Sequence, residues 1–255
     1  MSVKKKVKAI VIRQKEISSG VFDMWLRAEG IADVAVPGQF VDMYCTDGSR
    51  LLPRPISICE IDKADSSIRL VYRILGKGTE EFSNLSAGMW LDVIGPLGNG
   101  FPLKTKKAFL IGGGIGIPPM LELAKQLDCE KKAILGFRED TFLVDDFRLF
   151  SDVYIATEEG GTGTQGNVLD AIRENGLSAD IIYACGPTPM LRAIKRYAQE
   201  HHIECWLSLE ERMACGIGAC LGCVCKSKNK DSHTNVKNKR VCKEGPVFRA
   251  EEVEI

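Results

Sequence analysis

Four cysteines near the C-terminal end limit most strongly what this chain can fold into. Cys215, Cys220 and Cys223 follow one another with four and then two residues between them, and Cys242 lies farther along. Three close thiolates and one remote thiolate match the plant-type spacing of a [2Fe–2S] cluster. This part of the chain must therefore wrap around an inorganic core, and the chain is expected to move electrons.

The residues around these cysteines favour a cluster over other metal sites. Gly216, Gly218 and Gly222 separate the ligands, and glycine lets a loop approach a core closely and adopt positive φ. Cys225 competes with Cys242 for the fourth position. We expect Cys242, because a segment returning from a long excursion can approach the cluster from another side. Structural zinc is the alternative, but zinc sites commonly use two short cysteine knuckles, which this spacing fits poorly.

The composition is that of an ordinary globular protein. The 255 residues, 45% hydrophobic and 27% charged, can form two domains and a small appendage. A net charge of zero gives no general attraction to nucleic acid or acidic lipid. No apolar signal-peptide core follows Lys4–Lys6, and no run of apolar residues is long enough to span a membrane. We therefore expect a cytoplasmic protein.

The apolar rhythm divides the chain into three regions and predicts an α+β multidomain fold. Residues 1–103 are expected to form an antiparallel β-barrel, because short apolar or alternating runs recur at even spacing between turn residues. One helix is expected at Thr79–Leu85, and the glycine-rich stretch Gly95–Gly100 marks the end of the region. The predicted strands are Val7–Ile12, Val21–Leu26, Gln39–Tyr44, Ile56–Ile61, Ile68–Ile74 and Trp90–Ile94.

Residues 104–205 change to alternating strands and helices, which predicts a parallel sheet covered on both faces. Residues 206–255 form a small cluster-binding segment, with a polar, lysine-rich hairpin or loop over Lys226–Lys239. The strands and helices predicted in the middle region are Ala108–Ile111, Pro118–Leu127, Lys132–Phe137, Val153–Ala156, Val168–Glu174, Asp180–Cys185 and Pro189–Glu200.

A flavin-binding segment is indicated by Arg54-Pro55-Ile56-Ser57 at the start of a strand. The planar guanidinium of Arg54 can hold a pyrophosphate through two parallel hydrogen bonds, and the Ser57 hydroxyl can reach a flavin ring. Gly76-Lys77-Gly78-Thr79 opens a helix and offers backbone N–H donors to an anion. A surface salt bridge and a simple turn are the respective alternatives.

A nucleotide-binding loop is indicated by the run Gly112-Gly113-Gly114-Ile115-Gly116 between a strand and a helix. Consecutive glycines let a diphosphate approach the backbone. Cys185-Gly186-Pro187 ends a later parallel strand, where ligands gather, although it can also be a plain turn. The stretch at 157–160 lacks the basic residues that a 2′-phosphate would need, so NAD is favoured over NADP.

Together these motifs resemble the ferredoxin–NADP reductase superfamily, which pairs an N-terminal flavin barrel with a C-terminal nicotinamide domain. The usual flavin motif of that superfamily is Arg-x-Tyr-Ser or Arg-x-Tyr-Thr, and Ile56 replaces the aromatic residue here. The resemblance implies FAD rather than FMN and assigns contacts with FAD to Val71, Tyr72 and Arg73. It also places Cys185 close to the locus of hydride transfer.

One branch of the superfamily is closer still. The cysteine loop Met213–Cys223 and the segment Arg240–Phe248 resemble the electron-transfer subunits of type B dihydroorotate dehydrogenases. This resemblance implies a partner subunit that carries FMN and oxidises dihydroorotate in pyrimidine biosynthesis, in a heterotetramer with two copies of each subunit. Electrons would then pass from FMN to the [2Fe–2S] cluster, to FAD and to NAD⁺, the substrate. No catalytic acid–base residue is expected in this chain.

The order of carriers has a physical reason, because NAD⁺ accepts a hydride whereas a cluster carries single electrons, so that a flavin must convert between them. Two alternatives remain at this point. The chain can be the flavin and iron–sulfur subunit of another complex, such as a ferredoxin–NADP transhydrogenase or a sulfite reductase. It can also be a non-enzymatic redox sensor whose cluster controls binding to another molecule.

Overall fold

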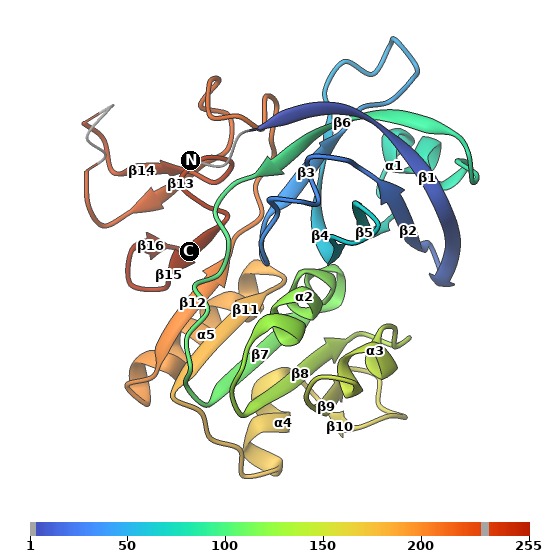
Figure 1. Ribbon diagram of the computed structural model, residues 1–255. Coiled ribbons are helices and arrows are strands. Elements are labelled where there is room, and N and C mark those ends of the chain that lie inside the picture. The colour runs from blue at the N-terminus through green and yellow to red at the C-terminus, as the bar shows by residue number, and fades with distance from the viewer. Residues whose placement is uncertain (1–3, 231–234) are drawn as a thin grey trace.

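The computed structural model describes residues 4–230 and 235–255, and its first third closes into a six-stranded antiparallel barrel (Figure 1). The strand order is β1-β2-β5-β4-β3-β6, and the barrel closes because β1 pairs with both β2 and β6. One short helix, α1 (Lys77–Ser83), lies between β5 and β6. The strands are β1 (Lys5–Ser18), β2 (Val21–Arg27), β3 (Phe40–Met43), β4 (Arg54–Asp62), β5 (Ser67–Arg73) and β6 (Trp90–Leu97).

The barrel confirms the predicted architecture, although several strands are longer than the apolar runs indicated, β1 and β6 among them. β1 continues to Ser18 because its polar second half, Arg13–Ser18, still pairs with β2. β6 continues through Gly95 and Pro96 to Leu97, so that the glycine-rich stretch begins inside the strand. Backbone pairing with a neighbouring strand, which leaves no mark on hydrophobic periodicity, extends both elements.

The nucleotide domain is a twisted sheet in the order β10-β9-β8-β7-β11-β12-β15, parallel except for β15. Helices α4 and α5 cover one face and α2 and α3 the other. All six residues of β7 are buried, as expected for a central parallel strand. The elements are β7 (Ala108–Gly113), the 3₁₀-helix η1 (Gly114–Gly116), α2 (Pro118–Gln126), β8 (Lys131–Phe137), α3 (Val144–Arg148), β9 (Asp152–Thr157), β10 (Thr164–Gln165), α4 (Val168–Glu174), β11 (Ile181–Cys185), α5 (Thr188–Glu200) and β12 (Glu204–Ser208).

The cluster segment does not stand apart from this sheet. β12 runs across residues 205 and 206, and β15 (Val247–Arg249) pairs with β12 as the last strand. Three other strands, β13 (Val224–Ser227), β14 (Asn238–Arg240) and β16 (Val253–Glu254), form a small sheet of their own. β13 and β14 pair antiparallel, as in the predicted hairpin, whose residues 231–234 lie outside the described part.

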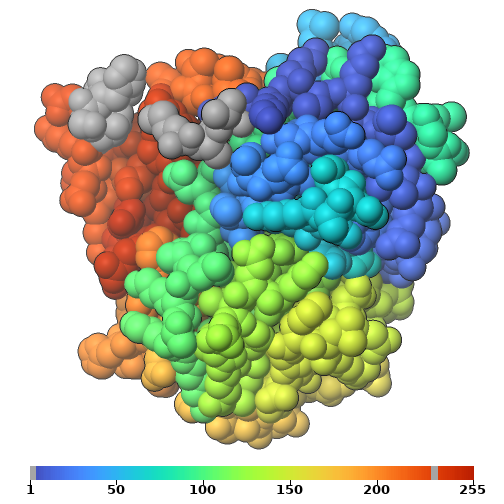
Figure 2. Space-filling view, in the orientation of Figure 1, coloured from blue at the N-terminus to red at the C-terminus, as the bar shows by residue number. Residues whose placement is uncertain are grey.

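The three regions meet in one body, with the barrel above the nucleotide domain and the cluster segment beside both (Figures 1 and 2). Asn99, just after the barrel, reaches the cluster segment: its N–H donates to the Gly245 carbonyl at 2.6 Å, and its side chain donates to the Glu244 carbonyl at 2.9 Å. Within the described residues, every helix is too short or too polar to cross a membrane.

Candidate functional site

The four predicted ligand cysteines lie in two pairs. The side chains of Cys215 and Cys220 are neighbours, and so are those of Cys223 and Cys242. Among residues 4–230 and 235–255, no three histidine, cysteine or acidic side chains converge on one point as a mononuclear metal site would require. Two thiol pairs from one loop and one returning segment are the donor set that a dinuclear cluster needs, two thiolates for each iron.

The loop directs backbone N–H groups at these sulfurs. The N–H of Ala219 donates to Cys215 Sγ at 3.3 Å, and the N–H of Gly222 donates to Cys220 Sγ at 3.4 Å. Burial by itself raises the pKa of Cys215, but N–H donors including those of Ile217 and Cys220 outweigh it and lower the pKa to about 6. A thiolate is the form of cysteine that binds iron. The loop therefore favours the iron-binding form of Cys215 before a cluster is bound.

The fourth position distinguishes Cys242 from Cys225. The backbone N–H of Cys242 donates to Cys223 Sγ at 3.4 Å, which brings the returning segment against the third cysteine. Cys225 lies inside β13, and burial raises the pKa of its thiol to about 11. Strand alternation does not separate Cys223 from Cys225, because residues i and i+2 share a face. What distinguishes Cys242 from Cys225 as the fourth ligand is that Cys242 returns to Cys223.

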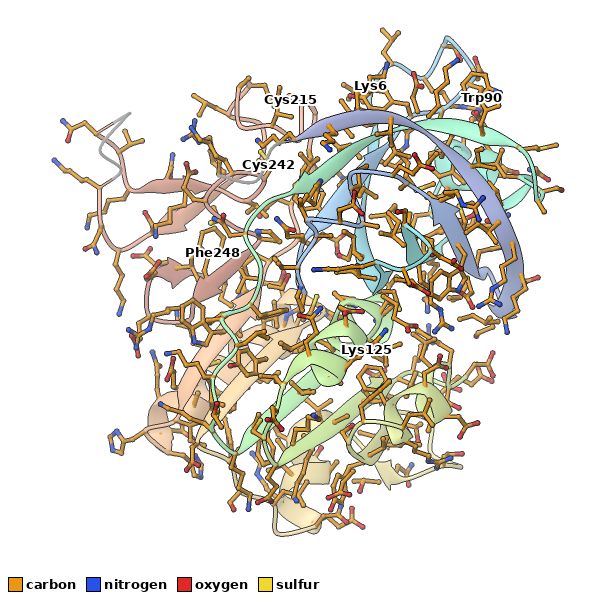
Figure 3. The ribbon with its side chains drawn as sticks, in the orientation of Figure 1. Lys6, Trp90, Lys125, Cys215, Cys242 and Phe248 are labelled. Carbon is orange, nitrogen blue, oxygen red and sulfur yellow. The ribbon has the colours of Figure 1, made fainter. Side chains whose placement is uncertain are left out.

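A buried carboxylate that the sequence analysis missed links the cluster loop to the barrel. Asp42 of β3 is fully buried, and neither of its carboxylate oxygens has a hydrogen-bond partner among the described residues. Its Oδ2 lies where a Cβ on Gly216 would be, and Gly216 has φ +61°. In the strand register Asp42 stands opposite Pro55. A single strand therefore separates the cysteine loop from the predicted flavin segment, and Figure 3 shows Cys215 and Cys242 where the cluster segment meets the barrel.

The predicted flavin segment opens onto a basic cleft. Arg54 begins β4, and its guanidinium packs on the backbone of Gly78, where any Cβ would overlap it. This close approach joins the two halves of the predicted phosphate site, the arginine and the start of α1. The cleft has a volume of about 510 Å³ and is lined by Asp47, Ser49, Arg50, Leu51, Leu52, Arg54 and Lys77. Arg50 is held in ion pairs with Asp47 and Glu81, so Arg54 and Lys77 are the cations of the cleft that suit a diphosphate.

The other predicted flavin residues divide into available and committed side chains. Ile56, Ser57 and Arg73 are partly or fully exposed. Tyr72 points into the barrel, where its hydroxyl donates to Gln14 Oε1 at 2.8 Å, so its ring cannot cover a flavin. Val71 is buried as well, and the Thr79 hydroxyl bonds the backbone of Leu75 and Gly76.

The two predicted nucleotide loops lie against each other at the carboxyl ends of neighbouring strands. Gly112, one residue before the end of β7, stands opposite Cys185, the last residue of β11. A Cβ on Gly116 would come within 2.5 Å of the Cys185 carbonyl, so glycine is needed there for the loops to touch. Gly114, with φ +52°, has no neighbouring side chain above it and offers open backbone to a diphosphate. The remaining predicted residues, Gly113, Gly186 and Pro187, pack together around Met190.

Cys185 is held as a neutral thiol. Burial raises its pKa to about 12, and a hydrogen bond with Ser208 offsets this only in part. A thiol with this pKa is a poor nucleophile at neutral pH. Its place where the loop at 185–187 touches the loop at 112–116 suits contact with a nicotinamide ring, with no covalent step.

The missed residue Asp42 has a visible signal in the sequence. The strand Phe40-Val41-Asp42-Met43 is apolar except for one carboxylate, and all four residues are buried. An acidic residue in such a run needs a partner or a functional reason.

Comparison with known proteins identifies relatives along nearly the whole chain. Residues 210–254 match the family described as the iron–sulfur cluster binding domain of dihydroorotate dehydrogenase B. The "Dihydroorotate dehydrogenase B (NAD(+)), electron transfer subunit" of Geobacillus sp. strain WCH70 is 44% identical, with 95% of this chain and 96% of the relative covered. The protein with this description from Listeria monocytogenes is 45% identical, with 96% and 97% covered.

A solved structure shows a similar arrangement of all three regions. A chain from the structure of an NADH-dependent reduced ferredoxin–NADP oxidoreductase is 29% identical and superposes with a TM-score of 0.87. The match covers 97% of this chain and 90% of that chain. The barrel, the nucleotide domain and the cluster segment are therefore shared as one unit.

Proposed function

Because this chain belongs to the electron-transfer subunits of NAD⁺-dependent dihydroorotate dehydrogenase B, we propose that it passes electrons from dihydroorotate oxidation to NAD⁺. It is an oxidoreductase subunit of pyrimidine biosynthesis that holds FAD and a [2Fe–2S] cluster and uses NAD⁺ as its substrate. The observation that carries the proposal is the two thiol pairs one strand away from the flavin segment.

Each part of the chain has a separate task in this function. When bound, the cluster carries single electrons and FAD exchanges them for the hydride that NAD⁺ accepts. Cys215, Cys220, Cys223 and Cys242 hold the irons. Arg54 and the backbone at Gly78 hold the FAD diphosphate, whereas Ile56, Ser57 and Arg73 face the flavin. The loops at 112–116 and 185–187 hold NAD⁺.

The partner is a catalytic subunit that contains FMN and oxidises dihydroorotate, in a heterotetramer with two copies of each subunit. The face of this chain that docks with the partner includes the outer thiol pair, Cys215 and Cys220. Cys220 is exposed, and the large apolar side chains beside it, Ile217 and Leu221, are 45% and 48% exposed. Apolar side chains around an accessible sulfur suit a dry contact between two electron carriers.

The proposal can be tested with the chain and its catalytic subunit produced together and purified without oxygen. The wild-type complex should form NADH from dihydroorotate and NAD⁺. Each copy of this chain should contain about two irons and two sulfides, the content of a [2Fe–2S] cluster.

Two serine variants test the order of carriers. Cys242→Ser should lose the cluster and dihydroorotate-dependent NADH formation, while NADH still reduces the FAD directly. Cys225→Ser is the matched control and should keep its iron and its full rate. A colourless wild-type protein that holds zinc would refute the proposal, as would a folded Cys242→Ser variant whose FAD is not reduced by NADH.

A further inference from the structure

One arginine of the barrel is shared by carboxylates from two domains. Arg69 of β5 is 8% exposed, and its Nε and Nη2 pair with Asp23 of β2 at 2.9 and 3.0 Å. Its Nη1 also pairs with Glu60 of β4 at 3.1 Å and with Asp146 of α3 at 2.5 Å. The first two carboxylates belong to the barrel, and the third comes from the nucleotide domain.

A second set of polar contacts crosses the same boundary nearby. Lys125 of α2 pairs with Glu60 of β4 at 3.2 Å, so its side chain reaches the barrel. Glu122, also on α2 and 2% exposed, accepts a hydrogen bond from the Ile61 N–H at 2.7 Å. In the space-filling view the barrel strands rest directly on α2 and α3 (Figure 2). Both strands β4 and β5 are thus tied to the nucleotide domain through buried or half-buried charges.

The elements joined here are those that hold the two reactants. β4 begins with the flavin segment Arg54–Ser57, and β5 ends with Arg73, another predicted flavin residue. α2 starts directly after the nucleotide loop at 112–116. The contacts of Glu122 and Lys125 therefore connect β4 to the helix that follows the nucleotide loop. The Arg69–Asp146 pair connects β5 to α3, which packs beside that helix. Hydride transfer requires reacting atoms about 3–3.5 Å apart, and a misplacement of about 1 Å can reduce a rate 100-fold.

We propose that Arg69 and Asp146 are positioning residues that hold the nucleotide domain against the barrel at the spacing required for hydride transfer. This inference rests on the proposed function, because it concerns the step between FAD and the nicotinamide. Asp146 is the informative member, since it alone among the carboxylates on Arg69 belongs to the other domain. Without it, Arg69 keeps Asp23 and Glu60, so that no buried charge is left unpaired.

The test uses the complete complex with Asp146→Asn. NADH is mixed rapidly with the oxidised protein, so that each NADH gives one hydride, two electrons and a proton, to the bound flavin and becomes NAD⁺. We expect the rate constant of flavin reduction to fall about tenfold or more, as a small displacement implies. The long-wavelength charge-transfer absorbance of the NADH–flavin pair should weaken, while FAD content and the NADH concentration for half-saturation change little. Asp146→Glu should recover most of the rate.

Asp145→Asn is the matched control, because Asp145 precedes Asp146 on α3 but is 91% exposed and pairs only with Arg148 among the described residues. It should reduce flavin at the wild-type rate. The inference is overturned if Asp146→Asn keeps both the wild-type rate and the charge-transfer absorbance, or if Asp145→Asn loses as much. It is also overturned if Asp146→Asn lowers only the melting temperature. Wild-type protein that binds FAD but is never reduced by NADH would overturn the proposed function itself.

Discussion

At the scale of single residues, the contact between Asp42 and Gly216 decides whether the cysteine loop can reach the barrel. Burial and the neighbouring Cys215 raise the pKa of the Asp42 carboxyl to about 7. Glycine at 216 is needed twice, once for its positive φ and once because a Cβ would overlap Asp42. Of the three glycines that separate the cysteines of the loop, Gly222 has neither requirement.

Gly216→Ala should therefore abolish cluster binding, because the new Cβ pushes the loop carrying Cys215 away from the barrel. Gly222→Ala is the matched control, since its Cβ would make only ordinary contacts, the nearest at 3.4 Å from Cys220 Sγ. Iron and sulfide analysis of the purified chains checks both, with near-zero iron expected for the first and full occupancy for the second. The double variant Asp42→Ala/Gly216→Ala should recover iron in part. Full iron in Gly216→Ala would contradict this account of the loop.

At the scale of elements, the start of α1 and the start of β4 form the phosphate side of the flavin cleft together. Arg54 lies on Gly78 because no side chain separates the helix from the guanidinium. Gly76, two residues earlier, has extended backbone and no atom within 4 Å of a built Cβ. A side chain is therefore excluded at Gly78 but has open space at Gly76.

Gly78→Ala should displace the Arg54 guanidinium and weaken FAD binding about tenfold, the equivalent of about 1.4 kcal/mol for a disturbed charge-assisted contact. Gly76→Ala should leave the affinity nearly unchanged. Titration of the apoprotein with FAD, followed by quenching of flavin fluorescence, measures both. Equal affinities for the two variants would remove Arg54 from the diphosphate site.

At the scale of the whole molecule, the carboxylate of Glu204 anchors the segment between the barrel and the nucleotide domain, which contains Lys104 and Lys106. Glu204, at the start of β12, pairs with Lys106 at 2.9 Å and Lys104 at 2.5 Å and accepts from the Trp206 ring N–H at 2.8 Å. Burial alone raises the pKa of Glu204, but these three donors outweigh it and lower the pKa to about 2. The ionised form thus stabilises the folded chain at every pH above its ordinary pKa of 4.5.

Glu204→Gln should lower the melting temperature at pH 7 by about 2–4 °C, the effect of losing about 1 kcal/mol in a chain of this size. Because the folded-state pKa is depressed, this stabilisation is lost as the pH falls from 4.5 toward 2. The gap between variant and wild type should therefore be constant from pH 8 to 5 and narrow at pH 3. Melting curves at these pH values check the prediction. A gap that widens in acid would contradict it.

The sequence by itself determined the local chemistry of this protein. The cysteine spacing, the glycine loops and the apolar runs of β7 and β8 each reflect demands that a residue meets within its own segment. Ligand type, backbone freedom and burial are demands of that kind. They were enough to predict the barrel, the parallel sheet and the electron carriers FAD and [2Fe–2S].

Only the tertiary structure decided how these segments meet. The pairing of Cys223 with Cys242, the contact of Asp42 with Gly216 and the bridge from Arg69 to Asp146 all join residues far apart in the chain. Such contacts depend on how whole elements pack, and a single sequence carries no local periodicity for them. The physical reason is that a buried charge or thiol is stabilised by what surrounds it in space, whatever its neighbours along the chain.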